Sequence, residues 1–137
     1  MGLFERLVKN GDIVIENYSP RVRPNRGINY PVLKAINPAI IYCSMPGYGP
    51  EGPFQHFVSY GTTIDPHSGL ASRMGYPGEE PHMSGNAYPD PASGMFATGA
   101  IMTALFSRYR TGKGQYISLA QAESGTRLLY TSPSPRD

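Results

Sequence analysis

The feature that most constrains the fold of this chain is the alternation of helical and β-rich segments in its first third. Apolar residues at helical spacing stop at Asn10-Gly11, and β-branched runs follow each helical segment. The predicted order is a helix from Leu3, a strand over 12–17, a helix from Asn29 that ends before Pro38, and a strand over 39–44. Helix, strand, helix and strand in this order predict an α/β fold with a parallel sheet.

The second half of the chain is less regular. Residues 45–57 are rich in glycine and proline and are expected to form a loop, and residues 58–89 are hard to assign beyond a short helix within 64–74. Pro91 opens the clearest helix, which runs to Tyr109 and stops at 111–114. Residues 115–119 then resemble a third strand.

Composition excludes several classes of protein. With 39% hydrophobic and 16% charged residues the chain fits a folded globular protein, and no run approaches the ~20 apolar residues of a membrane helix. The net charge is +2, and the only local concentration of basic residues lies within 21–26, which argues against a nucleic-acid surface. The single cysteine, Cys43, lies in an apolar run and predicts a buried thiol in a cytoplasmic protein.

The last ten residues, 128–137, change character abruptly and are similar to a translated sequencing adapter. We therefore predict a native segment of 1–127 followed by a tail that is not native. An ordinary disordered C-terminus is the alternative.

The segment 47–52 is a literal G-x-G-x-x-G that follows a predicted strand. In a dinucleotide site such glycines let a helix N-terminus approach a pyrophosphate. Here Pro50 and Pro53 interrupt the turn and no helical pattern follows. The sequence favours a glycine-rich turn over a dinucleotide site.

Five segments, in the same order along the chain, resemble the family III CoA-transferases, the group that includes formyl-CoA and carnitine CoA-transferases (CaiB/BaiF type). Residues 12–20 resemble the family's "ADVVIENFRP", and 47–53 resemble "SGFGQTGP". The five segments are 12–20, 33–44, 47–53, 88–95 and 110–116. The resemblance implies a Rossmann-like α/β domain, incomplete at both ends, from a longer protein whose two chains interlock as a homodimer. The isolated segment is expected to be inactive.

The resemblance places Asp90 at the family's catalytic aspartate. It implies a covalent mechanism in which this carboxylate carries coenzyme A between an acyl-CoA and a free carboxylic acid, with no metal. Asp90 directly precedes Pro91 at a helix start, where the helix dipole favours an ionised carboxylate. A plain N-cap is the alternative role for Asp90.

The resemblance also implies contacts to coenzyme A, although less securely than it implies the nucleophile. Asn25 stands where a basic residue often occurs in the family, with Arg26 beside it, and Tyr60 stands where the family has a substrate-side aromatic residue. Tyr60 is equally compatible with a core position. The expected binding residues are Asn17, Tyr18, Ser19, Asn25, Arg26, Gly47, Gly49 and Tyr60.

Two other functions remain open from the sequence. An α-methylacyl-CoA racemase of the same fold needs an acid/base pair, and its relatives carry histidine where this chain has Tyr60. His56, His67 and His82 are out of register with that position. A nucleotide-binding module without catalytic activity is the alternative from a different class.

Overall fold

The computed structural model describes residues 2–129 and contains one parallel sheet of three strands. The strands are β1 (Ile13–Glu16), β2 (Ile41–Ser44) and β3 (Tyr116–Ser118), in the order β1-β2-β3. Ile13 pairs with Ile41, and Tyr42 pairs with Tyr116. The predicted parallel α/β fold is confirmed.

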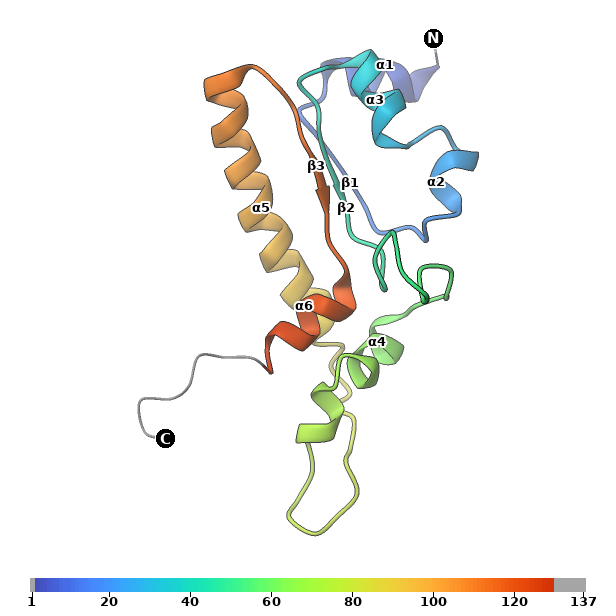
Figure 1. Cartoon of the computed structure of the whole chain (residues 1–137), viewed down its shortest axis with the longest axis vertical. Helices are drawn as coiled ribbons and strands as arrows, with labels where there is room; N and C mark the ends of the chain where they lie inside the picture. The colour runs from blue at the N-terminus through green and yellow to red at the C-terminus, as the bar shows by residue number, and fades with distance from the viewer. Residues whose placement is uncertain (1, 130–137) are drawn as a thin grey trace.

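Helices cover both faces of this sheet. Figure 1 shows α1 and α3 on one side of the strands and α5 on the other. The helices are α1 (Leu3–Asn10), α2 (Val22–Asn25), α3 (Tyr30–Ile36), α4 (Gly61–His67), the 3₁₀ helix η1 (Leu70–Arg73), α5 (Pro89–Thr111) and α6 (Gln121–Arg127).

The two faces of β2 lead into two separate hydrophobic clusters because successive side chains of a strand point to opposite faces. Tyr42 packs with Val8 of α1 and Leu33 of α3. Its neighbour Cys43 packs with Ala97 and Ile101 of α5 on the opposite face. The middle strand is therefore buried on both faces, as a central parallel strand requires.

The predicted elements before residue 45 and the third strand are found with bounds shifted by one or two residues. Asn29 is the N-cap of α3, as predicted, but its side chain makes no capping hydrogen bond. The long helix α5 begins at Pro89, because the first turn of a helix needs no proline N–H and accepts both Pro89 and Pro91. The short helix predicted within 64–74 is instead α4 followed by η1.

Two helices were not predicted. Both α2 and α6 are short, with four and seven residues. Residues 130–137 of the predicted tail lie outside the described residues. Within residues 2–129 none of the helices combines the length and the apolar character needed to cross a membrane.

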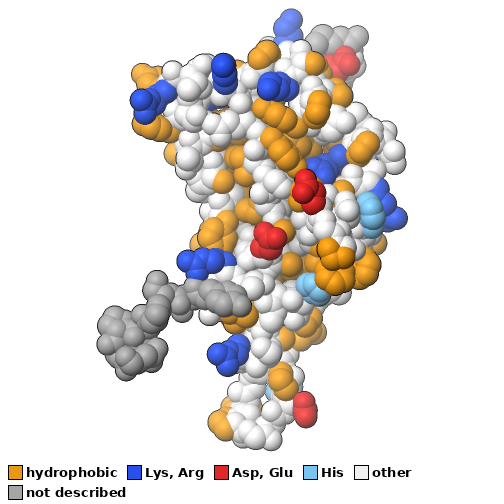
Figure 2. Space-filling model, viewed as in Figure 1, with side chains coloured by type: hydrophobic (Ala, Val, Ile, Leu, Met, Phe, Trp, Pro, Cys, Tyr) orange, Lys and Arg blue, Asp and Glu red, His pale blue; other side chains and the backbone are white. Residues whose placement is uncertain are grey.

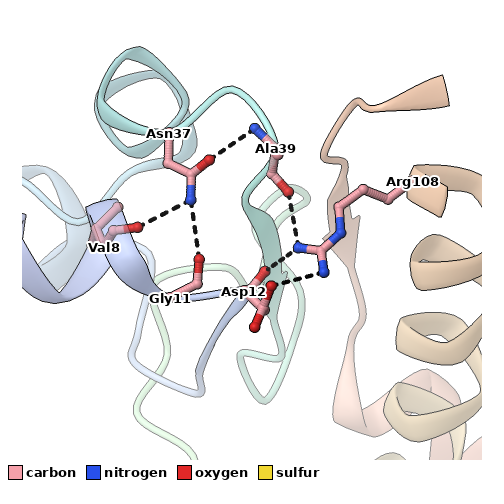
Figure 3. Close-up of polar contacts among 6 residues, drawn as sticks. All are labelled: Val8, Gly11, Asp12, Asn37, Ala39 and Arg108. Atoms are coloured by element: carbon pink, nitrogen blue, oxygen red, sulfur yellow. Dashed lines mark hydrogen bonds and ion pairs between the residues drawn. The ribbon is translucent and has the colours of Figure 1, made fainter.

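The C-terminal end of α5 is tied to the sheet by Arg108 (Figure 3). Its Nη1 donates hydrogen bonds to the carbonyls of Asp12, at 3.2 Å, and Ala39, at 3.3 Å, and its Nη2 donates to Asp12 Oδ1 at 2.9 Å. One guanidinium therefore holds the residues that precede β1 and β2. On the other side of these strands, the Asn37 amide donates to the carbonyls of Val8 and Gly11.

We expect Arg108→Met to lower the free energy of unfolding by about 2 kcal/mol, mainly because the Ala39 carbonyl loses the Arg108 donor and the Asp12 carbonyl keeps only the N–H of Ile41. The ion pair itself contributes little, since the Asp12 side chain is 74% exposed. Urea denaturation measures the loss. Arg110→Met is the control, because the Arg110 guanidinium lies over the Phe106 ring, 5.9 Å from its centroid, and within the described residues no hydrogen bond from it to the sheet is found. Equal losses in the two variants would contradict this role.

Candidate active site

A cavity of ≈ 400 Å³ lies at the carboxyl edge of the sheet and contains Asp90. Asn17 follows the end of β1, Met45 follows β2, and Gln121 comes shortly after β3. In open parallel sheets ligands bind at this edge, outside the carboxyl ends of the strands. The lining residues are Asn17, Met45, Ser59, Tyr60, Gly61, Ile64, Asp90 and Gln121.

Asp90 is the second residue of α5, and it is exposed. Tyr88, not Asp90, occupies the N-cap position, and no side chain there makes a capping hydrogen bond. The predicted alternative, a plain N-cap, is therefore wrong, because α5 starts one residue before the aspartate. A carboxylate in the first turn of a long helix lies at the positive end of the helix dipole.

Gly61, the first residue of α4, allows the Asp90 carboxylate to lie directly against the backbone. A Cβ at this position would stand 2.5 Å from Asp90 Oδ2 and 3.0 Å from its Cγ, and it would overlap the Cβ of Ala87. Non-bonded carbon and oxygen atoms do not approach this closely. Any larger residue at position 61 must displace the carboxylate or the segment that carries it.

Gln121 joins the ends of β2 and β3 within the cavity. Its Nε2 donates to the carbonyl of Met45 at 2.9 Å, and its backbone N–H donates to the carbonyl of Pro46 at 3.2 Å. The residue is only 7% exposed. Gln121 was not predicted from the sequence. Its position just after the third predicted strand could have indicated it, because the carboxyl ends of parallel strands lie at the same edge of a sheet.

The structure brings Asn17 and Tyr60 to Asp90, among the predicted site residues. Gly47 lies behind this cavity, where a Cβ would overlap the Ser59 side chain. Gly49 lines a separate cavity of ≈ 450 Å³ beside β3. The other predicted residues, which do not line the Asp90 cavity, are Tyr18, Ser19, Asn25 and Arg26.

The glycine-rich segment 47–52 forms turns, as predicted. Gly49 and Gly52 have positive φ angles of 83° and 96°, which favour glycine. The next helix, α4, begins only at Gly61. The segment therefore does not lead directly into a helix N-terminus, which a dinucleotide site would require.

A buried polar network supports the end of β1 next to Asn17. The Tyr42 hydroxyl donates to Glu16 Oε1 at 3.1 Å, and the N–H of Tyr18 donates to Glu16 Oε2 at 2.8 Å. Arg23 lies 3.8 Å from Glu16 and donates to Ser44 Oγ at 2.9 Å. These bonds fix the backbone on which the predicted contact residues 17–19 stand.

Within this network, the pKa of the Tyr42 phenol is shifted most clearly. Burial, together with the charge of Glu16 and the hydrogen bond to it, raises the pKa of Tyr42 well above its ordinary value of 10.0. The neutral phenol is favoured in the folded state. Its contribution to stability is therefore fully present below about pH 10 and is lost as the pH rises further.

We expect Tyr42→Phe to cost about 1 kcal/mol near neutral pH, because Glu16 loses a donor. Above about pH 10 the difference between the variant and the parent should shrink, by up to ~1.4 kcal/mol per pH unit. Urea denaturation across this range tests both statements. Tyr18→Phe, at a half-exposed tyrosine, is the control. A constant difference at every pH would contradict the prediction.

The three histidines lie away from the Asp90 cavity. The His67 ring packs against Tyr48 and Phe54, with centroids 4.8 Å and 5.1 Å apart. His82 lies 3.6 Å from Glu79, and His56 is exposed. Figure 2 shows hydrophobic side chains gathered beside histidine side chains on the face that it draws. None of the three lines the cavity as a candidate acid or base.

The chain belongs to CoA-transferase family III, whose profile it matches over residues 2–134. It is 37% identical to the succinate–glutarate CoA-transferase of Agrobacterium fabrum, over 93% of this chain and 32% of that protein. It is 36% identical to the acetyl-CoA:oxalate CoA-transferase of Acetobacter aceti, over 93% of this chain and 33% of that protein.

A solved structure of a CaiB/BaiF family protein from Brucella suis has the same fold, with a TM-score of 0.88 and 39% identity. The match covers 93% of this chain and 34% of that one. The chain thus spans about a third of the length of the relatives that it matches.

Proposed function

We propose that this chain is the nucleophile-bearing part of a longer CoA-transferase, in which Asp90 carries coenzyme A from an acyl-CoA to a free carboxylic acid. The observation that carries the proposal is the position of Asp90, a carboxylate with an open face in a cavity at the carboxyl edge of a parallel sheet. The membership of the chain in a family of CoA-transferases supports it.

The proposed reaction passes the acyl and CoA groups through Asp90. The carboxylate attacks the thioester carbonyl, the C–S bond breaks, and an acyl-aspartyl anhydride and CoA thiolate result. The thiolate then attacks the aspartyl carbonyl, which releases the first acid and leaves an aspartyl-CoA thioester. The acceptor carboxylate attacks this thioester to give a new anhydride and thiolate. Attack of that thiolate on the new acyl carbonyl forms the product acyl-CoA and frees Asp90.

The side chains around Asp90 can donate hydrogen bonds to a carbonyl oxygen on which negative charge develops. Among the lining residues Asp90 alone is charged, and Asn17, Ser59, Tyr60 and Gln121 offer neutral polar groups. The Asn17 amide and the Tyr60 hydroxyl are the proposed donors to the attacked carbonyl, since donors that face a developing oxyanion lower the barrier. Within this proposal the CoA nucleotide extends along Tyr18 and Ser19 toward Asn25 and Arg26.

Small dicarboxylic acids are the proposed acceptor class. Relatives of this chain are named for succinate, glutarate and oxalate transfer. We further propose that the complete protein is a cytoplasmic homodimer.

To test the proposal, the complete reading frame is expressed and the purified protein is incubated with a panel of acyl-CoAs. Borohydride or hydroxylamine trapping followed by peptide mass spectrometry reads the peptide that contains Asp90. A trapped Asp90 that depends on the donor supports the transferase, and the reactive donor indicates the substrate. An unmodified Asp90, with exchange of the α-proton into solvent, would instead support the racemase. If neither appears, the nucleotide-binding alternative is favoured.

A further inference from the structure

Gln121 differs from the other polar residues of the Asp90 cavity because its side chain has a fixed orientation. Among the side chains that line this cavity, that of Gln121 alone makes a hydrogen bond to another part of the described chain. Its Nε2 donates to the carbonyl of Met45, and its backbone N–H donates to the carbonyl of Pro46. Because a carbonyl oxygen can only accept, the nitrogen of the Gln121 amide faces Met45 and the amide oxygen points elsewhere.

The amide oxygen of Gln121 is free to bind a ligand. Within residues 2–129 no N–H or O–H donates to Gln121 Oε1. This oxygen is also not one of the buried side-chain atoms that lack a partner in the same residues. Those atoms are Arg23 Nε, Asn29 Oδ1, Asp65 Oδ1 and Ser93 Oγ. Since Gln121 is only 7% exposed and lines the cavity, its accessible oxygen faces that space. The cavity therefore contains a fixed, neutral hydrogen-bond acceptor in addition to the Asp90 carboxylate.

An acceptor oxygen needs a donor, and few groups of the proposed substrates provide one. Carboxylate and thioester oxygens only accept hydrogen bonds. In every acyl-CoA the donor closest to the reacting atoms is the amide N–H of the cysteamine unit, two carbons from the sulfur. With the thioester carbon about 3 Å from the Asp90 carboxylate, this N–H lies within about 8 Å of it. It therefore reaches the cavity that Gln121 and Asp90 both line.

We infer that Gln121 is a positioning residue, whose Oε1 accepts a hydrogen bond from the cysteamine amide of coenzyme A and thereby places the sulfur next to Asp90. This role rests on the proposed transfer of coenzyme A. In that reaction the CoA thiolate leaves the acyl carbon and returns to the aspartyl carbonyl. An amide that is held two carbons from the sulfur keeps the thiolate within reach of Asp90 between these two steps.

The test compares two ligands by calorimetry with the complete protein. One ligand is coenzyme A, and the other is an analogue in which an ester oxygen replaces the cysteamine amide nitrogen. We expect coenzyme A to bind about 10-fold more tightly, because the analogue leaves the Gln121 acceptor unpaired. In Gln121→Met, which keeps the length of the side chain but has no amide oxygen, the two dissociation constants should be equal. A merely structural role would weaken the binding of both ligands alike and would preserve their ratio.

Gln115→Met is the matched control. It makes the same chemical change at an exposed glutamine before β3, whose Nε2 donates to Ser107 Oγ at 2.8 Å, and it should preserve the ratio. Equal binding of the two ligands by the parent protein, or a ratio that persists in Gln121→Met, would overturn the inference. A loss of transfer in Gln121→Met that is confined to hydroxy acids would also overturn it, because the acceptor would then serve the acid.

Binding of coenzyme A and trapping of Asp90 are read separately. If the ratio changes as expected but Asp90 is never modified, Gln121 keeps its role and the proposed transfer mechanism fails. If Asp90 is trapped but the protein does not distinguish the two ligands, only the role of Gln121 fails. A complete protein that does not bind coenzyme A would refute both.

Discussion

Replacing Asp90 by asparagine is expected to lower CoA transfer in the complete protein by roughly 10³-fold or more, because the amide cannot act as the nucleophile. The change keeps the shape of the side chain and its place in the first turn of α5. The free energy of unfolding should change little, since Asp90 is exposed and does not cap the helix. Initial rates with several acyl-CoA donors measure the loss.

The control for this variant is Asp12→Asn, which makes the same change at an exposed aspartate at the opposite end of the sheet. It should keep full activity. The kinetic pattern distinguishes the roles further: a nucleophile changes the turnover number for every donor, whereas a residue that only binds substrate raises KM. Residual transfer above a tenth of the parent rate in Asp90→Asn would remove Asp90 from the proposed mechanism.

Local sequence patterns were sufficient to predict the framework of this fold. The strand β1 is short and rich in β-branched residues, β2 is short and apolar, and α5 is a long helix of 23 residues with proline in its first turn and Gly112 after its last. The short helices α2 and α6 gave no such signal. Helices of four and seven residues gain their stability from tertiary packing more than from propensity. Their sequences therefore need not contain a pattern that predicts a helix.

The residues of the candidate site were also only partly predictable from the sequence. Asn17 and Asp90 could be proposed from segments that resemble a known family, and the parallel sheet accounts for their convergence. Gln121 and Gly61 could not, because their roles depend on contacts between segments far apart in the chain. The contact of Gly61 with Asp90 joins two helices separated by loops, and no spacing rule predicts such a contact.

Glycine at position 61 is expected to be needed both for activity and for stability. We expect Gly61→Ala to lower transfer about 10²-fold, because its Cβ would stand 2.5 Å from Asp90 Oδ2 and force the carboxylate out of position. Overpacking should also cost about 1–3 kcal/mol of stability. Steady-state rates and urea denaturation measure the two effects. Gly94→Ala is the matched control on α5, where a Cβ meets no atom within 4 Å, and it should be as active as the parent and slightly more stable.

A double variant separates the two contacts that the new methyl group would make. Gly61→Ala also overlaps the Cβ of Ala87, so Ala87→Gly removes that overlap and leaves the contact with the Asp90 carboxylate. If the carboxylate must lie against a bare backbone, Gly61→Ala with Ala87→Gly recovers stability but not activity. If the double variant instead transfers CoA at the parent rate, then glycine at position 61 serves only to pack α4 against the segment before α5, and the position of Asp90 tolerates more displacement than the proposed attack allows.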